Sequence, residues 1–524
     1  MRNRLLAASL VAALAVGTAP LSAKTFRWAN DGDVSSMDPY GRNETLLLSF
    51  LGNVYEPLFR RDADLKLEPA LAVSSSQPAP DIWRFQLRHD MTFQDGTPFG
   101  ADDVLFSATR ARHPNSRMNT KLARIKEVRK IDDYTVDFVT DGPDPILREE
   151  ISDWYIMSKA WAEKNGAVEP ADLSKLQEGY ASRNANGTGP FMLKERQPDV
   201  KTVLVPNPKW WDKPKHNLHE VAFLRIANDS TRVAALLSGE IDMIYTVPPQ
   251  DMQRLAQTPG VRILEKPELR VVFFGFDQMS PVLRSSDIKD RNPFKDVRVR
   301  KALYQAIDIE AIKTKVMRGA AVPVGNMIAH GINGFDAEAD KRLTYDPAAA
   351  KNLLTEAGYP QGFRFMMDCP NDRYVNDGAI CEAVAAMFSR IGVEVELNAQ
   401  TRSKHFGKLL NKETDFYMLG WTPSTYDAHN AIFNLMMTWN DKDQGTNNIL
   451  GYSNKRVDEF GNAIGIELDP AKRGAMIKEA LIIHRDEVGH IPLHQQTVVW
   501  AARSTIHLTQ LADNTFPFRL VTVD

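Results

Sequence analysis

The chain has 524 residues, of which 43% are hydrophobic and 25% charged, so it holds enough apolar material for several buried cores. Its 64 basic and 67 acidic residues leave a formal net charge of −3, which excludes a protein that binds nucleic acid through a generally basic surface. Aromatic residues make up 9% of the chain, a share that argues against intrinsic disorder.

The first 23 residues have the layout of a secretory signal peptide. Residues 1–4 include two arginines, residues 5–16 form an apolar run with one serine, and the segment ends on the small residue Ala23. An apolar run of about 12 residues is too short to span a bilayer, which argues against a membrane anchor. We therefore expect cleavage near Ala23 and export to the periplasm.

Local patterns in the first 308 residues predict both strands and helices. Alternating or short apolar runs predict strands over residues 25–30, 83–88, 135–139 and 241–245. Two helices are predicted, over 229–239 with Asp229 as the amino-terminal cap and Gly239 after the last turn, and over 293–308 with one buried face.

Helices and strands alternate between residues 346 and 421. The predicted elements are a helix over 346–358, a strand over 363–369, a helix over 379–390, and strands over 393–397 and 415–421. Strands joined through a helix within about 35 residues run parallel, so this region predicts an α/β sheet. Ligands bind at the carboxyl ends of such strands, where Trp421 lies.

The only two cysteines are Cys369 and Cys381. An even pair in an exported protein predicts one disulfide, although two free thiols remain the alternative. The pair has no nearby histidine and makes a poor metal site. The chain also has no Gly-x-Ser-x-Gly elbow and no phosphate-binding loop, so neither an enzyme nor a bound cofactor or metal is expected.

A series of motifs along nearly the whole mature chain resembles one known family. The motifs are Ser36–Pro39, Val54–Leu58, Trp83–Arg88 with Phe93–Pro98 and Ala101–Val104, Gly187–Phe191, Asn207–Trp211, Leu236–Asp242, Phe294–Leu303, Leu353–Tyr359 and Ile491–Leu493. In this order they are similar to the family 5 extracellular solute-binding proteins of ABC importers, which include dipeptide- and oligopeptide-binding proteins.

The resemblance implies a two-lobed α/β fold that closes on its ligand, the type II, large cluster C form of the periplasmic binding proteins. Lobe one would span residues 24–272, with an extra subdomain at about 58–181. Lobe two would span 273–494, and residues 495–524 would return to lobe one. The chain would cross between the lobes near residue 272 and again after residue 492.

The resemblance also implies a function. The protein would capture a small ligand, with a peptide as first choice, and deliver it to an ABC permease served by separate ATPase subunits. It would act as a monomer without cofactor and without nucleic acid. One alternative keeps the importer role but with a metal chelate, haem, an opine or a sugar as ligand. An exported hydrolase is the second alternative, although no nucleophile–base pair supports it.

Arg373 is the residue expected to hold a ligand carboxylate. It follows the predicted strand over 363–369, and dipeptide-binding relatives have an arginine in a similar loop that holds this group. A solvated surface arginine is the alternative reading. Tyr374 and Tyr40 are also expected to contact the ligand.

The amino end of the ligand raises a question that the sequence leaves open. In peptide-binding relatives, a strand ending in Gly-Trp is followed by an aspartate that pairs with the ligand's α-amine, whereas Ser424 stands at that position here. Either Asp427 takes over this role, which we favour, or the ligand has no free amine there. Trp421 is expected to pack against the ligand, and Tyr426 lies in the same loop.

Overall fold

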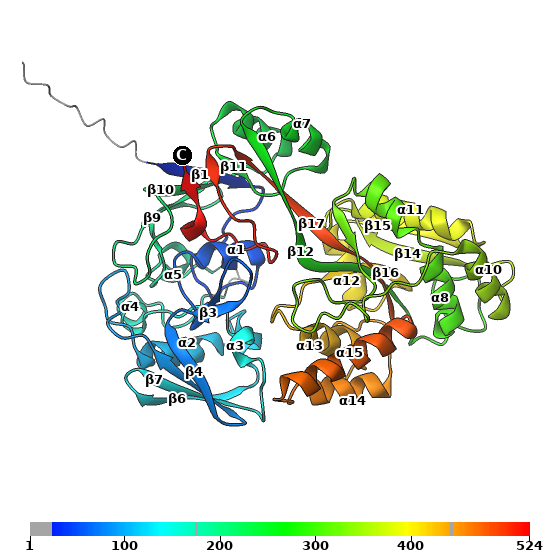
Figure 1. Ribbon diagram of the computed structural model, residues 1–524, viewed down its shortest axis with the longest axis horizontal. Helices are drawn as coiled ribbons and strands as arrows, with labels where there is room; N and C mark the ends of the chain where they lie inside the picture. The colour runs from blue at the N-terminus through cyan, green and yellow to red at the C-terminus, as the bar shows by residue number, and fades with distance from the viewer. Residues whose placement is uncertain (1–23, 173–176, 441–443) are drawn as a thin grey trace, which may run out of the picture.

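Two rounded lobes, joined by two long strands, make up the structure (Figure 1). It is a computed structural model that describes residues 24–172, 177–440 and 444–524, so the predicted signal peptide lies outside the described residues. The joining strands are β12 (Val261–Phe276) and β17 (His490–Arg503), which pair antiparallel. The two-lobed α/β fold expected from the sequence is therefore confirmed. Within the described ranges, no helix is long and apolar enough to cross a membrane.

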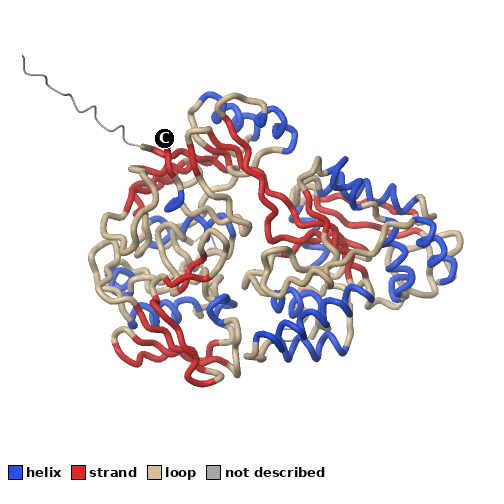
Figure 2. Tube along the Cα trace, in the orientation of Figure 1, coloured by secondary structure: helices blue, strands red, loops and turns tan. Residues whose placement is uncertain are grey.

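One eleven-stranded sheet runs through both lobes. Its order is β15-β14-β16-β12-β17-β11-β1-β10-β9-β8, with β13 (Ala321–Pro323) beside β17. Figure 2 shows its strands continuing from one lobe into the other. The predicted lobe limits at residues 272 and 494 fall inside the two shared strands, which belong to both lobes and give no single boundary residue. These limits stay a prediction.

In lobe one, the strand predicted from the alternation over residues 25–30 is present as β1, which lies between β10 and β11. Its strands are β1 (Thr25–Asn30), β8 (Phe191–Gln197), β9 (Lys201–Pro206), β10 (Glu220–Arg225) and β11 (Met243–Ile244). Strand β1 runs parallel to β10 and β11. Trp28 from β1 packs at 4.7 Å from Phe223 and at 5.6 Å from Phe516, between ring centroids, so the C-terminal segment helps to fill this core.

A separate four-stranded antiparallel sheet lies within the stretch predicted as the extra subdomain. Its order is β4 (Ala72–Ala79), β5 (Ile82–Leu87), β7 (Thr135–Thr140) and β6 (Ile125–Asp132). Trp83, Phe85 and Leu87 are buried on one side of β5, which confirms the strand predicted from their alternation. Helix α2 (Ala101–Ala111) packs on this sheet and contributes Val104 and Ala108 to the core of lobe one.

Lobe two holds the predicted parallel strands. They are β14 (Arg364–Pro370), β15 (Glu394–Gln400) and β16 (Phe416–Trp421), and β14 runs parallel to both others. The connecting helix is α11 (Asp377–Ser389), and α10 (Pro347–Glu356) is preceded by Asp346, whose carboxylate caps it. The α/β sheet predicted for this region is therefore confirmed.

Three local predictions differ from the structure. Helix α6 (Asp229–Ser238) is capped by Asn228 rather than by Asp229, since the Asn228 side chain accepts the Thr231 N–H. The strand predicted over 241–245 pairs only over two residues of β11. The helix predicted over 293–308 is shorter, because Asp296 caps α8 (Val297–Ala306) after a separate 3₁₀ turn.

The remaining elements are mostly short. In lobe one they are α1 (Thr45–Leu51), β2 (Phe59–Arg61), β3 (Leu67–Pro69), α3 (Leu147–Glu150), α4 (Lys159–Lys164), α5 (Tyr180–Arg183), α7 (Met252–Ala256), β18 (Ile506–His507) and β19 (Thr522–Val523). In lobe two they are α9 (Ile309–Ala311), α12 (Arg402–Leu410), α13 (Ala428–Ala431), α14 (Lys455–Ile464) and α15 (Pro470–Asp486).

Candidate functional site

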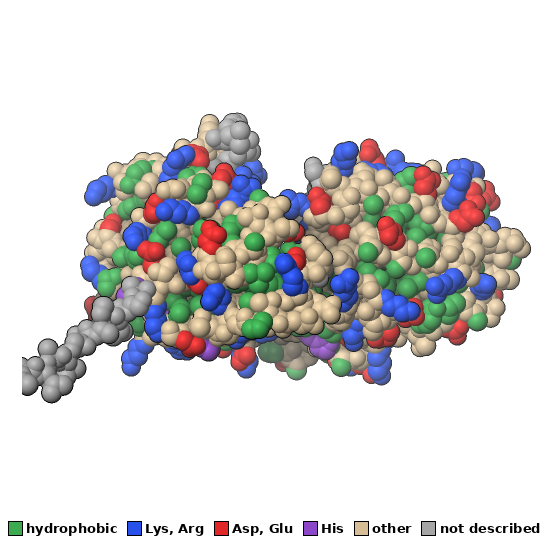
Figure 3. Space-filling view, turned by 90° about the horizontal axis from the view of Figure 1, so that it is seen from above, with side chains coloured by type: hydrophobic (Ala, Val, Ile, Leu, Met, Phe, Trp, Pro, Cys, Tyr) green, Lys and Arg blue, Asp and Glu red, His purple; other side chains and the backbone are tan. Residues whose placement is uncertain are grey.

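A cavity of about 800 Å³ lies where the two lobes face each other, and we call it the main cavity. Figure 3 shows the hollow that separates the lobes. Both lobes and both crossing strands line the main cavity. The lining residues used below are Asp31, Thr246, Glu268, Arg270, Arg318, Arg373, Tyr374, Asn376, Gln496 and Asn514.

The main cavity lies where parallel strands of both lobes end. Asp31 directly follows β1 in lobe one, and Arg373 and Tyr374 belong to the loop that follows β14 in lobe two. The carboxyl ends of parallel strands are the usual ligand sites of α/β sheets. The topology therefore places strand ends from both lobes, which belong to one shared sheet, on one cavity.

Unusual backbone conformations gather around the main cavity. Ten described residues other than glycine have a positive φ, and four of them line it: Thr246, Arg318, Asn376 and Asn514. Asparagine tolerates this conformation, but a β-branched threonine rarely adopts it. Strained residues of this kind concentrate at ligand-binding sites, so their position supports the main cavity as the functional site.

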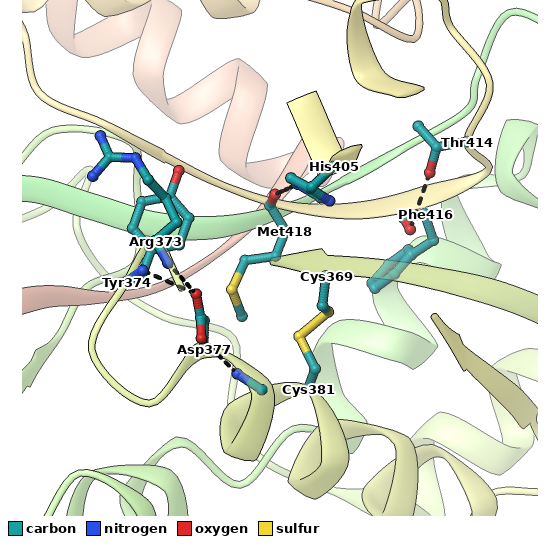
Figure 4. Close-up of a disulfide and its surroundings, with 10 residues drawn as sticks. Cys369, Arg373, Tyr374, Asp377, Cys381, His405, Thr414, Phe416 and Met418 are labelled. Carbon is teal, nitrogen blue, oxygen red and sulfur yellow. Dashed lines mark hydrogen bonds between the residues drawn. A yellow bond between two sulfur atoms is a disulfide. The ribbon is translucent and has the colours of Figure 1, made fainter. Parts of the chain in front are cut away.

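The loop that carries Arg373 is held from several sides (Figure 4). The carboxylate of Asp377 accepts the backbone N–H groups of Arg373 and Tyr374, each at 2.9 Å. The Tyr374 hydroxyl accepts the N–H of Gly420 at 2.8 Å, which ties the loop to β16. The loop is therefore fixed before any ligand arrives.

The predicted Cys369–Cys381 disulfide is present and joins the end of β14 to α11. It closes a loop of about 13 residues, for which the chain-entropy model gives roughly 3 kcal/mol. Replacing both cysteines with serine is expected to lower the free energy of unfolding by about this amount, measured by urea denaturation. An unchanged midpoint would show that the other contacts of the loop suffice without the bond.

Arg373 is a partly buried cation without an ionic partner. Its guanidinium lies 5.1 Å from the centre of the Tyr374 ring, and no carboxylate oxygen of the described chain lies within 4 Å of it. Burial lowers the pKa of Arg373, and the charge of Arg270 lowers it further. A ligand anion would relieve both effects.

Polar side chains of the crossing strands and of the C-terminal segment form a network in the lining of the main cavity. The Glu268 carboxylate accepts Arg270 Nε at 2.9 Å, Gln496 Nε2 at 2.7 Å and Asn514 Nδ2 at 3.3 Å. Sequence reasoning missed these residues. For Gln496, the signal is an amide side chain in a strand, β17, that is buried over nearly its whole length.

Of the residues predicted to meet the ligand's amino end, Ser424 is exposed and Trp421 is partly buried. Trp421 donates its indole N–H to Asn430 Oδ1 at 3.0 Å. Neither side chain is among those that line the main cavity. Contact between the ligand and these two residues stays a prediction.

The structure corrects the prediction that Asp427 holds an amine. Its carboxylate is fully buried and binds both terminal nitrogens of Arg473, at 2.6 and 2.8 Å. It also accepts the His429 N–H and the Asn333 side-chain amide. Both oxygens are therefore committed inside lobe two, and none is free for a ligand.

Tyr426 reaches from lobe two into lobe one. Its hydroxyl donates to Asp513 at 2.8 Å, and the Arg61 guanidinium lies 3.6 Å from its ring centre. Tyr426 has a φ of 59°, a costly conformation for an aromatic residue. The predicted ligand residue Tyr426 is thus part of the contact between the lobes.

Tyr40 is also placed differently from the prediction. It is fully buried in the core of lobe one and donates its hydroxyl to the Tyr155 carbonyl at 2.7 Å. A side chain enclosed in this way cannot meet a ligand in the cleft, so this prediction is corrected. Among the residues that the structure describes, no group of three His, Cys, Asp or Glu side chains is arranged to hold a metal ion.

Comparisons with known proteins identify the family of this chain. The profile of the bacterial extracellular solute-binding proteins, family 5 Middle, matches residues 66–443. The chain is 26% identical to the dipeptide-binding protein of Escherichia coli (strain K12), over 93% of this chain and 92% of that protein. It is 25% identical to the glutathione-binding protein GsiB of Shigella dysenteriae serotype 1 (strain Sd197), over 95% of this chain and 94% of that protein.

Solved structures share the fold. HbpA2 from Haemophilus parasuis superposes with a TM-score of 0.81 at 22% identity, covering 96% of this chain and 100% of that one. The periplasmic binding protein DppA from Helicobacter pylori, in complex with the peptide STSA, superposes with a TM-score of 0.75 at 23% identity, covering 95% and 98%. Since the family profile matches well over half of its length, the chain belongs to the bacterial extracellular solute-binding proteins, family 5.

Proposed function

We propose that this protein is the exported solute-binding component of an ABC importer and that it binds a peptide in the main cavity. It would deliver this ligand to a permease as a monomer, without catalysing a reaction. Relatives that bind dipeptides, glutathione and the peptide STSA support the choice of ligand class.

The observation that carries the proposal is the unpaired guanidinium of Arg373 in a cavity between the lobes. A guanidinium offers two parallel N–H donors, which match the two oxygens of a carboxylate. Every unmodified peptide ends in such a group. Because Arg373 follows a strand of lobe two, a ligand that binds there and also touches lobe one would favour the closed form.

Native mass spectrometry of protein purified from the producing cell tests the ligand class directly. We expect a retained mass that matches one peptide or a set of short peptides. Calorimetry with such a peptide should then show that amidation of its C-terminus weakens binding by about 30-fold or more. A retained ligand that is not a peptide, together with no binding of any peptide, would overturn the proposal.

The absence of catalysis needs its own measurement. We expect peptide and ester substrates to remain intact on prolonged incubation with the purified protein. Steady turnover that disappears after one substitution in the main cavity would show an exported hydrolase instead.

A further inference from the structure

A second, smaller cavity of about 90 Å³ lies where lobe one meets Tyr426, and we call it the small cavity. A cavity needs roughly 10–15 Å³ of such volume to hold one water molecule, so the small cavity has room for a group of several non-hydrogen atoms. One stretch of chain, residues 513–515, borders both the small cavity and the main cavity. Asp513 and Thr515 line the small cavity, and Asn514 between them lines the main cavity.

Three arginines line the small cavity, and one of them is fully neutralised. Arg60 lies 2.6 Å from Asp212, 2.7 Å from Glu68 and 3.5 Å from Glu56. These three carboxylates compensate the charge of the Arg60 guanidinium, which therefore needs no ligand anion.

The other two arginines lack such partners. Arg61 donates one hydrogen bond, from Nη1 to the Leu65 carbonyl at 2.7 Å, while its Nε and Nη2 are buried without a hydrogen-bond partner in the described chain. Arg519 donates to the Arg61 carbonyl at 3.0 Å, and its nearest carboxylate, that of Glu68, is 3.8 Å away. Burial, followed by the charge of Arg60, lowers the pKa of Arg519 to about 10.

The acidic groups that line the small cavity are already engaged. Glu56 accepts both indole N–H groups of Trp210 and Trp211, at 2.9–3.1 Å. Asp153 pairs with Lys121 at 2.8 Å through Oδ2, while its Oδ1 is buried without a hydrogen-bond partner in the described chain, and Asp513 accepts the Tyr426 hydroxyl. None of their oxygens lies within 4 Å of the Arg61 guanidinium in the described chain, although the charges of Asp513 and Asp153 act on it from a greater distance.

We propose that the small cavity is an anion subsite and that it takes the side-chain carboxylate of an acidic residue in the bound peptide. The inference rests on the proposed function and narrows its ligand class to acidic peptides. Water could satisfy the free N–H groups of Arg61 but would leave this cation without a carboxylate in direct contact, and buried charges in proteins are almost always paired. A carboxylate supplies both the acceptor atoms and the charge.

Matched peptides that differ only by Glu or Gln at one position test the subsite. The exchange is made at each position of an alanine tripeptide in turn, and binding to the wild-type protein is measured by calorimetry. At one position, the Glu peptide should bind at least tenfold more tightly than the Gln peptide. In the Arg61→Gln variant, the ratio of the affinity for the Glu peptide to that for the Gln peptide should fall to about one. Arg61 also contacts Tyr426, but a general loss of lobe closure weakens both peptides alike and leaves the ratio unchanged.

Arg88→Gln is the control, because Arg88 stacks on Trp211 at 3.8 Å without lining the small cavity. The Arg88→Gln variant should prefer the Glu peptide over the Gln peptide as strongly as the wild-type protein does, and Arg61→Lys should keep part of this preference. Wild-type protein that binds Glu and Gln peptides equally would overturn the subsite but not the proposed function. If the Glu and Gln peptides bind equally and acetate raises the Tm of the wild-type protein but not that of Arg61→Gln, the small cavity binds a free anion instead of a peptide side chain. This result would also overturn the proposed subsite. Protein that binds no peptide of the set would overturn both proposals.

Discussion

Replacing Asp427 with asparagine is expected to lower the free energy of unfolding by about 3–5 kcal/mol. The substitution would leave the charge of Arg473 buried without its partner, since Arg473 and Asp427 are both almost fully enclosed in lobe two. Asparagine would still be able to cap the short helix that follows, so the effect should come from the lost charge.

Urea denaturation followed by fluorescence measures this effect, with Ser424→Ala as the matched control. Ser424 is exposed and its loss should change stability by no more than about 0.5 kcal/mol. Because a two-lobed protein need not unfold in one step, the midpoint of the transition that reports on lobe two is the quantity to compare.

The double variant Asp427→Asn with Arg473→Gln sharpens the test. If Asp427 and Arg473 stabilise lobe two as an ion pair, removing both charges should lower the free energy of unfolding less than removing Asp427 alone, because no unpaired charge remains. Stable Asp427→Asn protein that has lost affinity for peptides with a free amine, but not for acetylated ones, would contradict this account. It would restore Asp427 as the amine anchor.

The difference between the predicted and observed roles of Asp427 has a physical cause. Its partner Arg473 lies 46 residues later, on a helix whose packing against the loop depends on the whole lobe. No local pattern in one sequence reports such a pairing. Tyr40 shows the same limit, because an aromatic ring with a hydroxyl suits a ligand cleft and a core with one carbonyl partner equally well.

Local patterns were sufficient where local interactions decide the structure. The alternation in β5 and the capping of α10 by Asp346 depend on neighbours a few residues away, and both predictions are confirmed. The disulfide was predictable because only one pairing of two cysteines exists. The parallel order of β14 and β15 followed from the short helical connection between them.

The crossing strands and their polar network were harder to predict. Strand β17 is buried over nearly its whole length, so it has no alternation of apolar and polar residues to identify it. Its position came only from the resemblance of the chain to a family. Glu268 and Gln496 meet across two strands far apart in sequence, at an interruption of the strand register, and only the pairing of β12 with β17 brings them together.

Arg373 remains the residue whose loss should have the largest effect on binding. Arg373→Ala is expected to weaken a peptide with a free C-terminus by about 2–4 kcal/mol, which corresponds to roughly 30- to 1,000-fold in Kd. Its guanidinium forms no ion pair in the described chain, so the substitution should leave the free energy of unfolding within about 0.5 kcal/mol of wild type. Arg402→Ala, which removes an exposed charge beyond the main cavity, is the matched control and should bind nearly as well as wild type.

A thermodynamic cycle that combines Arg373→Ala with amidation of the peptide distinguishes a direct contact from a general electrostatic effect. If Arg373 holds the C-terminal carboxylate, amidation should cost wild-type protein about as much as the substitution does, and it should cost the Arg373→Ala variant almost nothing more. Calorimetry on the four combinations gives the coupling free energy, which we expect to exceed about 1.5 kcal/mol. If amidation weakens binding equally in both proteins, the carboxylate lies elsewhere, and Arg373 acts on the ligand only through the charge that it adds to the main cavity.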